Sequence, residues 1–351
     1  MVLNMIRVNL SMFSFKKNIV FVEIMGIIIS FMVLNKCMNY ILVDDTYSYT
    51  RIMLHEMYTQ EQNIDTLFLG SSHCYRTFDT SITDGYLGNT FNAGSSSQAL
   101  DGSYALLVEA GKRNNLKRVF LEMYHEIVVG EYKERTELTS TYIISDYLRP
   151  SFNKYQYILN ASTREYWINS LFPARRNWKN IFNKDIIANN IRSKKSEPYI
   201  NYGYVNHGNE YYAGKGYVAN TGILNINDYK EAKYASIKQE HISKDNLSIL
   251  KKIIKYCKQN EIELVLLVVP MPEFRIDKVG NYGYYAEQIE DLANSEGIEF
   301  YDFNLCKEEY KFENEYFIDD HHLNKSGAEK FSLLFSRFYV GEIKEEEVFS
   351  N

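Results

Sequence analysis

The sequence predicts an α/β protein, a three-layer α/β/α sandwich with a central parallel sheet, preceded by one N-terminal transmembrane helix. Short apolar runs bounded by turn residues alternate with stretches of helical length along most of the chain. Such alternation is typical of right-handed β–α–β units, whose parallel sheet carries helices on both faces. With 351 residues, 45% of them hydrophobic, the chain is large enough for a substantial core.

Five strands are expected where an apolar run ends at small or polar turn residues. The first contains Leu67–Leu69 and breaks at Gly70. The others are predicted at Thr90–Ala93, Leu116–Met123, Ile262–Val269 and Ile298–Phe303. The intervening helices are predicted at Thr46–Gln60, Gln98–Asn114, Leu247–Gln259, Tyr284–Glu296 and Lys325–Tyr339. Because ligands of parallel sheets bind beyond the carboxyl ends of the strands, the residues that follow each strand are candidates for one site.

Residues 130–240 interrupt this rhythm and are predicted to form an insertion packed over the site. They contain both tryptophans and 14 of the 30 tyrosines. Aromatic faces of this kind can line a sugar or acyl groove, whereas a small satellite core is the simpler interpretation. Both interpretations are kept at this point.

The N-terminus predicts a membrane anchor. Ile19–Leu34 is apolar apart from Glu23, and basic residues precede it, whereas Asp44 and Asp45 follow it. The excess of positive charge before the run predicts a cytoplasmic N-terminus and an extracytoplasmic bulk. We therefore expect residues 1–18 in the cytoplasm, 19–43 as an uncleaved signal anchor and 61–343 as the extracytoplasmic domain. The alternative is a buried N-terminal helix of a soluble protein.

Charge and cysteine content exclude some classes of function. A formal net charge of −6 without a basic stripe argues against a nucleic-acid partner. The four cysteines, Cys37, Cys74, Cys257 and Cys306, fit no zinc-knuckle or C-x-x-C spacing. No metal ion and no organic cofactor is predicted from these residues.

Two separated motifs predict nucleophilic catalysis. Ser72 follows the first strand at the expected start of a helix, where backbone N–H groups can stabilise an oxyanion. Near the other end, Asp319 and His322 have the spacing that lets a carboxylate orient an imidazole, which could then take the proton of Ser72. Residues 319–322 could instead form a metal cluster or a solvated loop, although four consecutive loop residues cannot all face one ion.

These motifs resemble the SGNH/GDSL-type hydrolases. Gly70-Ser71-Ser72 is similar to their first block and Asp319-x-x-His322 to their last, and Leu323-Asn324-x-x-Gly327 looks like the membrane-anchored branch. That branch includes the D-alanyl transfer protein of lipoteichoic acid biosynthesis and the alginate O-acetylation proteins. The resemblance implies the SGNH-hydrolase/flavodoxin-like fold, a catalytic triad of Ser72, Asp319 and His322, and an oxyanion donor at Gly94.

The sequence departs from the family after the third strand. Where the family has Gly-x-Asn-Asp, this chain has Glu122-Met123-Tyr124-His125, so one expected oxyanion donor is missing or supplied elsewhere. Tyr124 is a candidate substitute. His73, next to the nucleophile, and Arg76, suited to an anionic group, are candidate substrate contacts, although helix-start chemistry and a surface position are the simpler interpretations.

The sequence thus predicts a membrane-anchored serine acyltransferase or esterase. It would act on O-acyl groups of a cell-surface polysaccharide or teichoic-acid-like polymer through an acyl-enzyme on Ser72. The resemblance alone implies a membrane-bound O-acyltransferase as partner. The alternative is a non-catalytic cell-surface binding or scaffold protein that keeps the SGNH fold.

Overall fold

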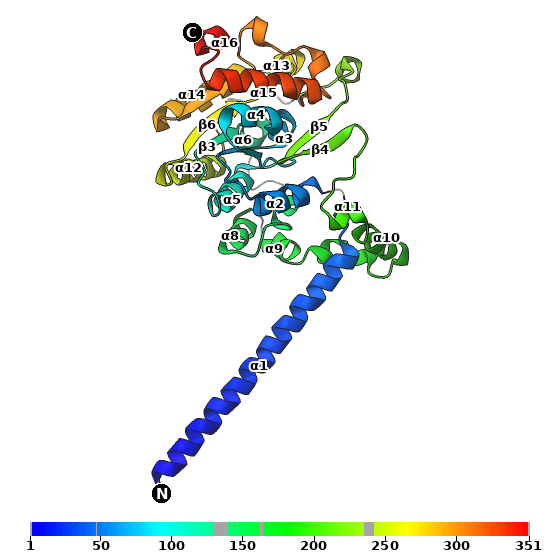
Figure 1. Cartoon of the computed structure of the whole chain (residues 1–351), viewed down its shortest axis with the longest axis vertical. Helices are drawn as coiled ribbons and strands as arrows, with labels where there is room; N and C mark the ends of the chain where they lie inside the picture. Colours follow the sequence, from blue (N-terminus) through cyan, green and yellow to red (C-terminus); the bar gives the residue numbers. More distant parts are fainter. Residues whose placement is uncertain (1, 47, 130–138, 162–163, 235–241, 350–351) are drawn as a thin grey trace. The chain divides into compact units, whose positions relative to one another are not determined.

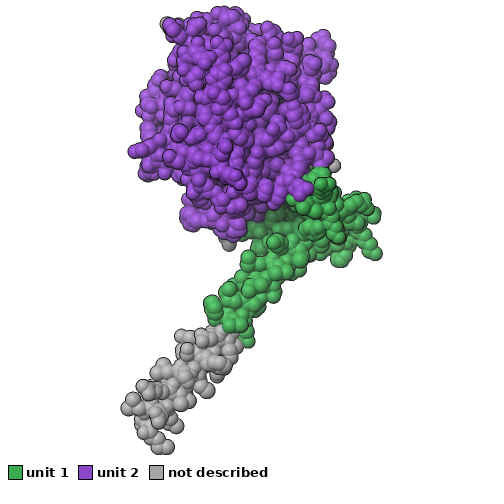
Figure 2. All heavy atoms as spheres, in the orientation of Figure 1, with its two compact units in different colours: residues 1–46, 171–200 green, residues 47–170, 201–351 purple. Residues whose placement is uncertain are grey.

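A computed structural model describes residues 2–46, 48–129, 139–161, 164–234 and 242–349 of the chain. The chain divides into two compact units (Figure 2). The smaller unit consists of residues 1–46 and 171–200, and the larger of residues 47–170 and 201–351. The candidate site lies entirely in the larger unit.

A five-stranded parallel sheet forms the centre of the larger unit, with strand order β2-β1-β3-β6-β7. Strands β3 and β6 of this sheet are labelled in Figure 1. The strands are β1 (Thr66–Leu69), β2 (Thr90–Asn92), β3 (Arg118–Glu122), β6 (Glu263–Val268) and β7 (Glu299–Asp302). All four pairings are parallel, and β1 lies between β2 and β3 with Leu67 opposite Phe91 and Val119. This is the flavodoxin-like order, so the predicted fold class is confirmed.

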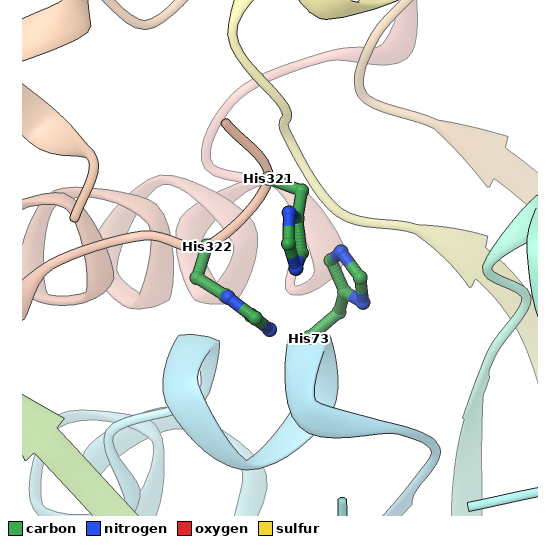
Figure 3. Close-up of side chains that lie close together, drawn as sticks. All are labelled: His73, His321 and His322. Atoms are coloured by element: carbon green, nitrogen blue, oxygen red, sulfur yellow. The ribbon is translucent and has the colours of Figure 1, made fainter. Parts of the chain in front are cut away.

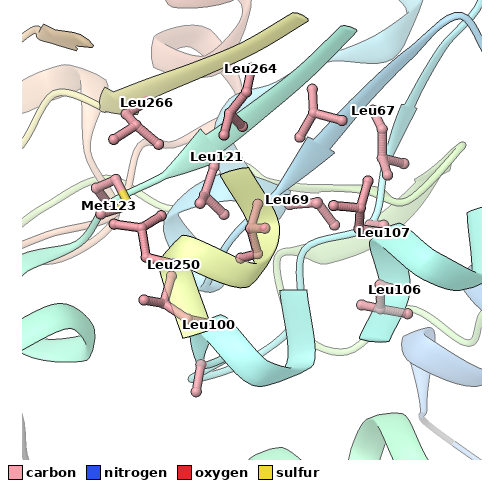
Figure 4. Packing of buried hydrophobic residues seen from close by; sticks show 14 of the residues in the cluster. Leu67, Leu69, Leu100, Leu106, Leu107, Leu121, Met123, Leu250, Leu264 and Leu266 are labelled. Atoms are coloured by element: carbon pink, nitrogen blue, oxygen red, sulfur yellow. The ribbon is translucent and has the colours of Figure 1, made fainter. Parts of the chain in front are cut away.

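Alternate strand residues supply the cores of the two sheet faces. Leu67, Leu69 and Leu121 point to one face, where leucines of α5 and α12 pack against them (Figure 4). Phe68 and Phe120 point to the opposite face, against α3, α4 and α15. Continuous apolar strands are expected when a parallel sheet is covered on both sides.

The helices of the larger unit surround this sheet. They are α2 (Tyr49–Thr59), α3 (Ser72–Thr77), α4 (Thr80–Leu87), α5 (Leu100–Gly111), α6 (His125–Val129), α7 (Thr139–Ser145), α8 (Phe152–Ala161), α9 (Arg164–Leu171, whose last residue joins the smaller unit), α12 (Lys244–Gln259), α13 (Glu273–Val279), α14 (Tyr282–Glu296), α15 (Lys325–Tyr339) and α16 (Glu345–Val348). Single turns of 3₁₀ helix are η3 (Ile226–Tyr229), η4 (Glu308–Tyr310) and η5 (Asn314–Tyr316).

An antiparallel hairpin, β4 (Glu210–Gly214) and β5 (Tyr217–Asn220), packs beside the edge strand β2. The backbone N–H of Asn92 donates to the carbonyl of Lys215 at 2.8 Å. Gly216 has a φ of +83°, and a Cβ there would lie 1.6 Å from the carbonyl oxygen of Asn92. The close approach of the two backbones therefore requires glycine at this position.

The smaller unit consists of α1 (Val2–Leu42), the 3₁₀ segment η2 (Pro173–Asn180), α10 (Lys184–Lys194) and α11 (Glu197–Ile200). In α1, Val20–Leu42 is apolar and long enough to cross a membrane, since 23 residues of helix extend about 34 Å. Lys194 donates to the carbonyls of Asn39, at 3.2 Å, and Val43. A buried lysine thus satisfies the carbonyl groups at the end of this helix.

The predicted and observed elements agree closely where both exist. Each predicted strand lies within two residues of the observed one at either end, and α15 has the expected bounds. Helix α13, which follows Pro272, was not predicted. The segment expected as a single insertion is divided, because residues 171–200 group with α1. Its parts 130–138, 162–163 and 235–240 lie outside the described residues, as does Met1 of the expected cytoplasmic segment.

Candidate active site

Ser72 lies at the carboxyl edge of the central sheet. Strand β1 ends at Leu69, Gly70 follows, and Ser71 caps α3, which begins at Ser72. From β1 the chain moves to the neighbour on one side, β2, and later returns to the other side as β3. In open parallel sheets this switch point is where ligands bind, so the topology itself exposes Ser72 at a binding edge.

Ser72, His322 and Asp319 form a continuous hydrogen-bonded chain. The Oγ of Ser72 lies 2.7 Å from Nε2 of His322, and Nδ1 of His322 lies 2.8 Å from Oδ2 of Asp319. The other oxygen of Asp319 accepts the backbone N–H groups of His321, at 3.0 Å, and His322, at 2.8 Å. Since an ionised carboxylate only accepts, the His322 proton lies on Nδ1 and Nε2 can accept the proton of Ser72.

The segment between η5 and α15 holds Asp319 and His322 in a tight loop. Phe317 and Leu323 form an antiparallel bridge and are both buried, and the N–H of Ile318 donates to the carbonyl of His322 at 2.9 Å. Asn324 caps α15 by accepting the N–H of Gly327 at 3.0 Å. A Cβ at Gly327 would lie 2.2 Å from the carbonyl oxygen of Tyr316. The Leu-Asn-x-x-Gly pattern therefore serves to fix the loop that carries the imidazole.

The environment of the pair favours a neutral imidazole beside an ionised carboxylate. Burial lowers the pKa of His322 to about 4, although the hydrogen bond with Asp319 acts in the opposite direction. For Asp319, burial acts to raise the pKa, but the hydrogen bond from His322 and the nearby histidines outweigh it and hold the pKa well below its usual range. Around neutral pH His322 is therefore able to act as a base.

Glu122, the last residue of β3, fixes the turn before the serine. Its Oε2 accepts the backbone N–H of Ser71 at 3.0 Å and the Ser71 hydroxyl at 2.9 Å. A Cβ at Gly70 would lie 2.6 Å from the Cβ of Glu122, so the turn needs glycine there. Burial raises the pKa of Glu122 to about 7. Glu122 is thus the first residue at the position where the family has Gly-x-Asn-Asp, and its side chain holds the turn before Ser72 by accepting hydrogen bonds from Ser71.

The two backbone N–H groups expected to stabilise an oxyanion, those of Gly94 and Ser72, differ in whether they already donate a hydrogen bond. The N–H of Gly94 donates to the side-chain oxygen of Asn92 at 3.1 Å. The N–H of Ser72 makes no hydrogen bond with any residue that the structure describes. Only the Ser72 N–H is therefore available as the structure stands, and Gly94 would have to exchange its partner.

His73 and Tyr124 pack together beside the triad. Their ring centroids are 3.9 Å apart, and the His73 ring lies 4.9 Å from that of His322. Both residues are buried, and Nη2 of Arg275 donates to the Tyr124 hydroxyl at 3.2 Å. Burial raises the pKa of Tyr124, so the phenol stays protonated. Tyr124 and His73 thus form one wall of the site.

Arg76 is engaged within the larger unit. It forms an ion pair with Glu210 of β4, and Tyr204 donates to the other oxygen of the same carboxylate at 2.7 Å. Its guanidinium carbon lies 5.2 Å from the centroid of the Tyr75 ring. An anionic substrate would have to compete with Glu210 for this arginine.

Sequence reasoning missed two residues that complete the site. These are Glu122, which departs from the family pattern, and Arg275 in the unpredicted α13. Nη1 of Arg275 donates at 3.3 Å to Asp320, which the sequence suggested only as part of an alternative metal cluster. One feature of the sequence could have indicated Glu122. It is the last residue of an apolar strand, and a carboxylate buried at such a position almost always has a partner. For Arg275 no pattern in the sequence pointed to the site.

Comparisons with known proteins add little about the activity. One protein-family model, which carries no descriptive name, matches residues 209–344, less than half of the chain. Among curated proteins none matches in sequence.

Solved structures match at low identity. A proposed platelet activating factor from Streptococcus pneumoniae has 12% identity and a TM-score of 0.37, with 87% of this chain and 96% of that chain covered. A GDSL-like lipase from Bacteroides thetaiotaomicron has 12% identity and a TM-score of 0.36, with 84% and 98% covered. A proposed acylhydrolase from Bacteroides fragilis has 9% identity and a TM-score of 0.34, with 84% and 94% covered. Since these TM-scores are all below 0.5, the function must be inferred from the geometry of the site.

Proposed function

We propose that the chain is a serine esterase or O-acyltransferase that works through an acyl-enzyme on Ser72. One observation carries the proposal, namely the unbroken contact from the Ser72 hydroxyl through His322 to Asp319. A hydroxyl, an imidazole and a carboxylate in this order are the components that activate a serine on unrelated folds. The resemblance of Gly70-Ser71-Ser72 and Asp319-x-x-His322 to SGNH/GDSL-type hydrolases supports the same assignment.

The reaction follows from the hydrogen-bond directions. Oγ of Ser72 attacks the carbonyl carbon of an ester while Nε2 of His322 takes the hydroxyl proton, and Asp319 stabilises the imidazolium. His322 then gives this proton to the leaving alcohol, which departs and leaves the acyl group on Ser72. A second hydroxyl, from water or an acceptor alcohol, then attacks the acyl group on Ser72 by the same steps in reverse, and the free serine is restored. The Ser72 N–H is the first donor for the oxyanion.

A membrane location is part of the proposal. The apolar helix Val20–Leu42, with basic residues before it and acidic residues after it, supports a single-pass anchor with the larger unit outside the cytoplasm. An acyl donor or acceptor at the cell surface would fit this location, such as a polysaccharide or a teichoic-acid-like polymer. A membrane-bound O-acyltransferase is the partner that the family resemblance suggests.

The test uses the full chain in detergent or nanodiscs with a fluorophosphonate probe and a chromogenic acetyl ester. We expect wild-type protein to be labelled on Ser72, as read from the labelled peptide by mass spectrometry. Ser72→Ala should lose both labelling and turnover. Ser295→Ala is the control that should keep labelling and turnover, because Ser295 is an exposed serine of α14 whose hydroxyl donates to the carbonyl of Leu292.

Two outcomes would contradict the proposal. Label found on Ser71 would move the nucleophile by one residue. Folded wild-type protein without label or turnover would favour the non-catalytic scaffold, an interpretation that the engaged N–H of Gly94 already supports.

A further inference from the structure

Three histidines converge beside the nucleophile, although they come from opposite ends of the chain. His73 belongs to α3, and His321 and His322 to the loop before α15 (Figure 3). One ring nitrogen of each lies within 4.8 Å of one nitrogen of each of the others. Figure 3 shows the three rings turned toward a common point. Imidazole is the commonest metal ligand in proteins, and three imidazoles form one known kind of zinc site.

The hydrogen bonds of the rings leave the same nitrogen of each directed inward. Nδ1 of His322 contacts Asp319 at 2.8 Å, and Nδ1 of His321 contacts Asp320 at 2.7 Å. Nδ1 of His73 contacts the Ser71 hydroxyl at 3.0 Å, and this hydroxyl in turn donates to Glu122. A histidine that binds a metal through one nitrogen almost always donates its other N–H to a carboxylate, carbonyl or water. His321 and His322 have that arrangement, whereas the partner of His73 is a hydroxyl that in turn donates to the carboxylate of Glu122.

His73 supplies the second, independent observation. The residue is 3% exposed, and its Nε2 has no hydrogen-bond partner among the residues that the structure describes. Because the Ser71 hydroxyl donates to Glu122, the His73 proton lies on Nδ1, and Nε2 carries a buried lone pair that faces His321 and His322. A buried acceptor without a partner costs free energy, which a bound cation would recover.

We propose that Nε2 atoms of His73, His321 and His322 bind one divalent transition-metal ion of the zinc class, and that this ion competes with Ser72. Three imidazoles and one open position are a common zinc arrangement. The carboxylates of Asp319 and Asp320, behind two of the rings, offset part of the positive charge of the ion. The competition follows from geometry, because the ion takes the lone pair of His322 that otherwise accepts the Ser72 proton.

The competition rests on the proposed function, whereas metal binding does not. Binding is therefore measured directly, by titrating metal-free full-length protein in nanodiscs with Zn²⁺ in a calorimeter and by metal analysis after desalting. Labelling of Ser72 by the fluorophosphonate probe is followed in parallel. We expect one ion per chain and a labelling rate that falls as the ion binds.

Four variants and one control separate the site from its alternatives. His73→Gln and His321→Gln should each weaken Zn²⁺ binding at least tenfold, and Asp320→Asn, which replaces the carboxylate behind His321 with a neutral amide, should weaken it about 10- to 100-fold. Ser72→Ala should keep the ion while losing the label. His207→Gln, at an exposed histidine in the larger unit, is the matched control and should bind as the wild type does.

Three results would overturn the inference. Metal-free protein that takes up no Zn²⁺ would refute the site, even if Ser72 were labelled normally. Undiminished binding in folded His73→Gln would move the ion to the rival set Asp319, Asp320 and His321. Binding that leaves the labelling rate unchanged would refute the competition. Circular dichroism and melting curves identify variants that fail to fold, and since His321 is only partly buried, His321→Gln remains informative if His73→Gln does not fold.

Discussion

Glu122 contributes to stability in a way that depends on its protonation. Burial raises its pKa to about 7, above the 4.5 expected in the unfolded chain, so the folded protein binds the extra proton between these values. Stability is therefore highest below pH 4.5 as far as this group is concerned, and falls as the pH rises to 7. The contribution of Glu122 makes the free energy of unfolding about 3 kcal/mol lower at pH 8 than below pH 4.5.

Replacing Glu122 by glutamine should remove this dependence. We expect Glu122→Gln to melt at a higher temperature than the wild type at pH 8, with the advantage disappearing toward pH 5, because the amide oxygen can still accept from Ser71. Scanning calorimetry at both pH values measures the difference. Glu287→Gln, at an exposed position of α14, should show no such trend. An advantage that is equal at both pH values would show that folding does not shift the pKa of Glu122.

Asp319 holds the tautomer of His322, and this role predicts a large kinetic effect. In Asp319→Asn the amide can donate to Nδ1, which moves the imidazole proton to Nε2 and removes the acceptor for Ser72. We expect the turnover number of the metal-free protein to fall by about 10³- to 10⁴-fold. The chromogenic ester assay checks this, with Asp320→Asn as the comparison, since the Asp320 carboxylate contacts His321 and Arg275 rather than His322. Equal losses in both variants would contradict the assignment.

At the scale of elements, the hairpin β4–β5 depends on one glycine for its contact with β2. In Gly216→Ala the new methyl group would have to sit 1.6 Å from the Asn92 carbonyl oxygen, at a φ that L-residues avoid. We expect this variant to lose about 3 kcal/mol of unfolding free energy or more. Gly283→Ala is the control, because nothing lies within 4 Å of its Cβ and α14 should gain about 0.5–1 kcal/mol from the change. Urea denaturation followed by circular dichroism measures both.

The strands and the site differ in how far the sequence predicted them. The apolar runs around Leu67 and Val265 were sufficient for the sheet, because a strand buried on both faces leaves a local pattern. Helix α13 left no such pattern, since Arg275 is buried within a short helix that follows Pro272. The division of residues 130–240 depends on contacts such as Lys194 with Asn39, which join segments far apart in the sequence.

For the site, spacing suggested Ser72, Asp319 and His322, and the structure places these side chains within hydrogen-bonding distance. Their roles remain predictions. His73 could not have been placed beside His321 from the sequence, because the direction of a side chain in a turn depends on its tertiary neighbours. The objection that four consecutive residues cannot face one ion was sound, but it did not consider a ligand from the other end of the chain.

At the scale of the molecule, the smaller unit predicts where the protein meets a bilayer. The ring of Phe172 packs at 5.4 Å on Phe31 within the apolar part of α1, and nearby Trp178 and Phe182 are 57% and 91% exposed. The N–H of Ala174, in the same segment, donates to the side chain of Asn39 near the end of the apolar stretch at 2.8 Å. If α1 spans the bilayer with Asn39 at its surface, Trp178 lies near the interface, where tryptophan is favoured.

Fluorescence can test this position, because the chain has only two tryptophans. In Trp167→Phe the remaining Trp178 should be blue-shifted and quenched by lipids brominated near the headgroup, compared with the same variant in unbrominated lipid. Trp178→Phe supplies the spectrum of Trp167 alone. Emission of Trp178 that is unaffected by the brominated lipid would place the segment in water and argue against the anchor.

The 250 residues between Ser72 and His322 also set an order in time. Ribosomes deliver Ser72 well before His322, so under the proposed function a nascent chain has a nucleophile without a proton acceptor until the loop before α15 has emerged. Under the same proposal, the growing polypeptide does not react with esters before that point. Products that end before this loop would keep Ser72 without the base proposed for it, so under the proposed function they would not react with esters.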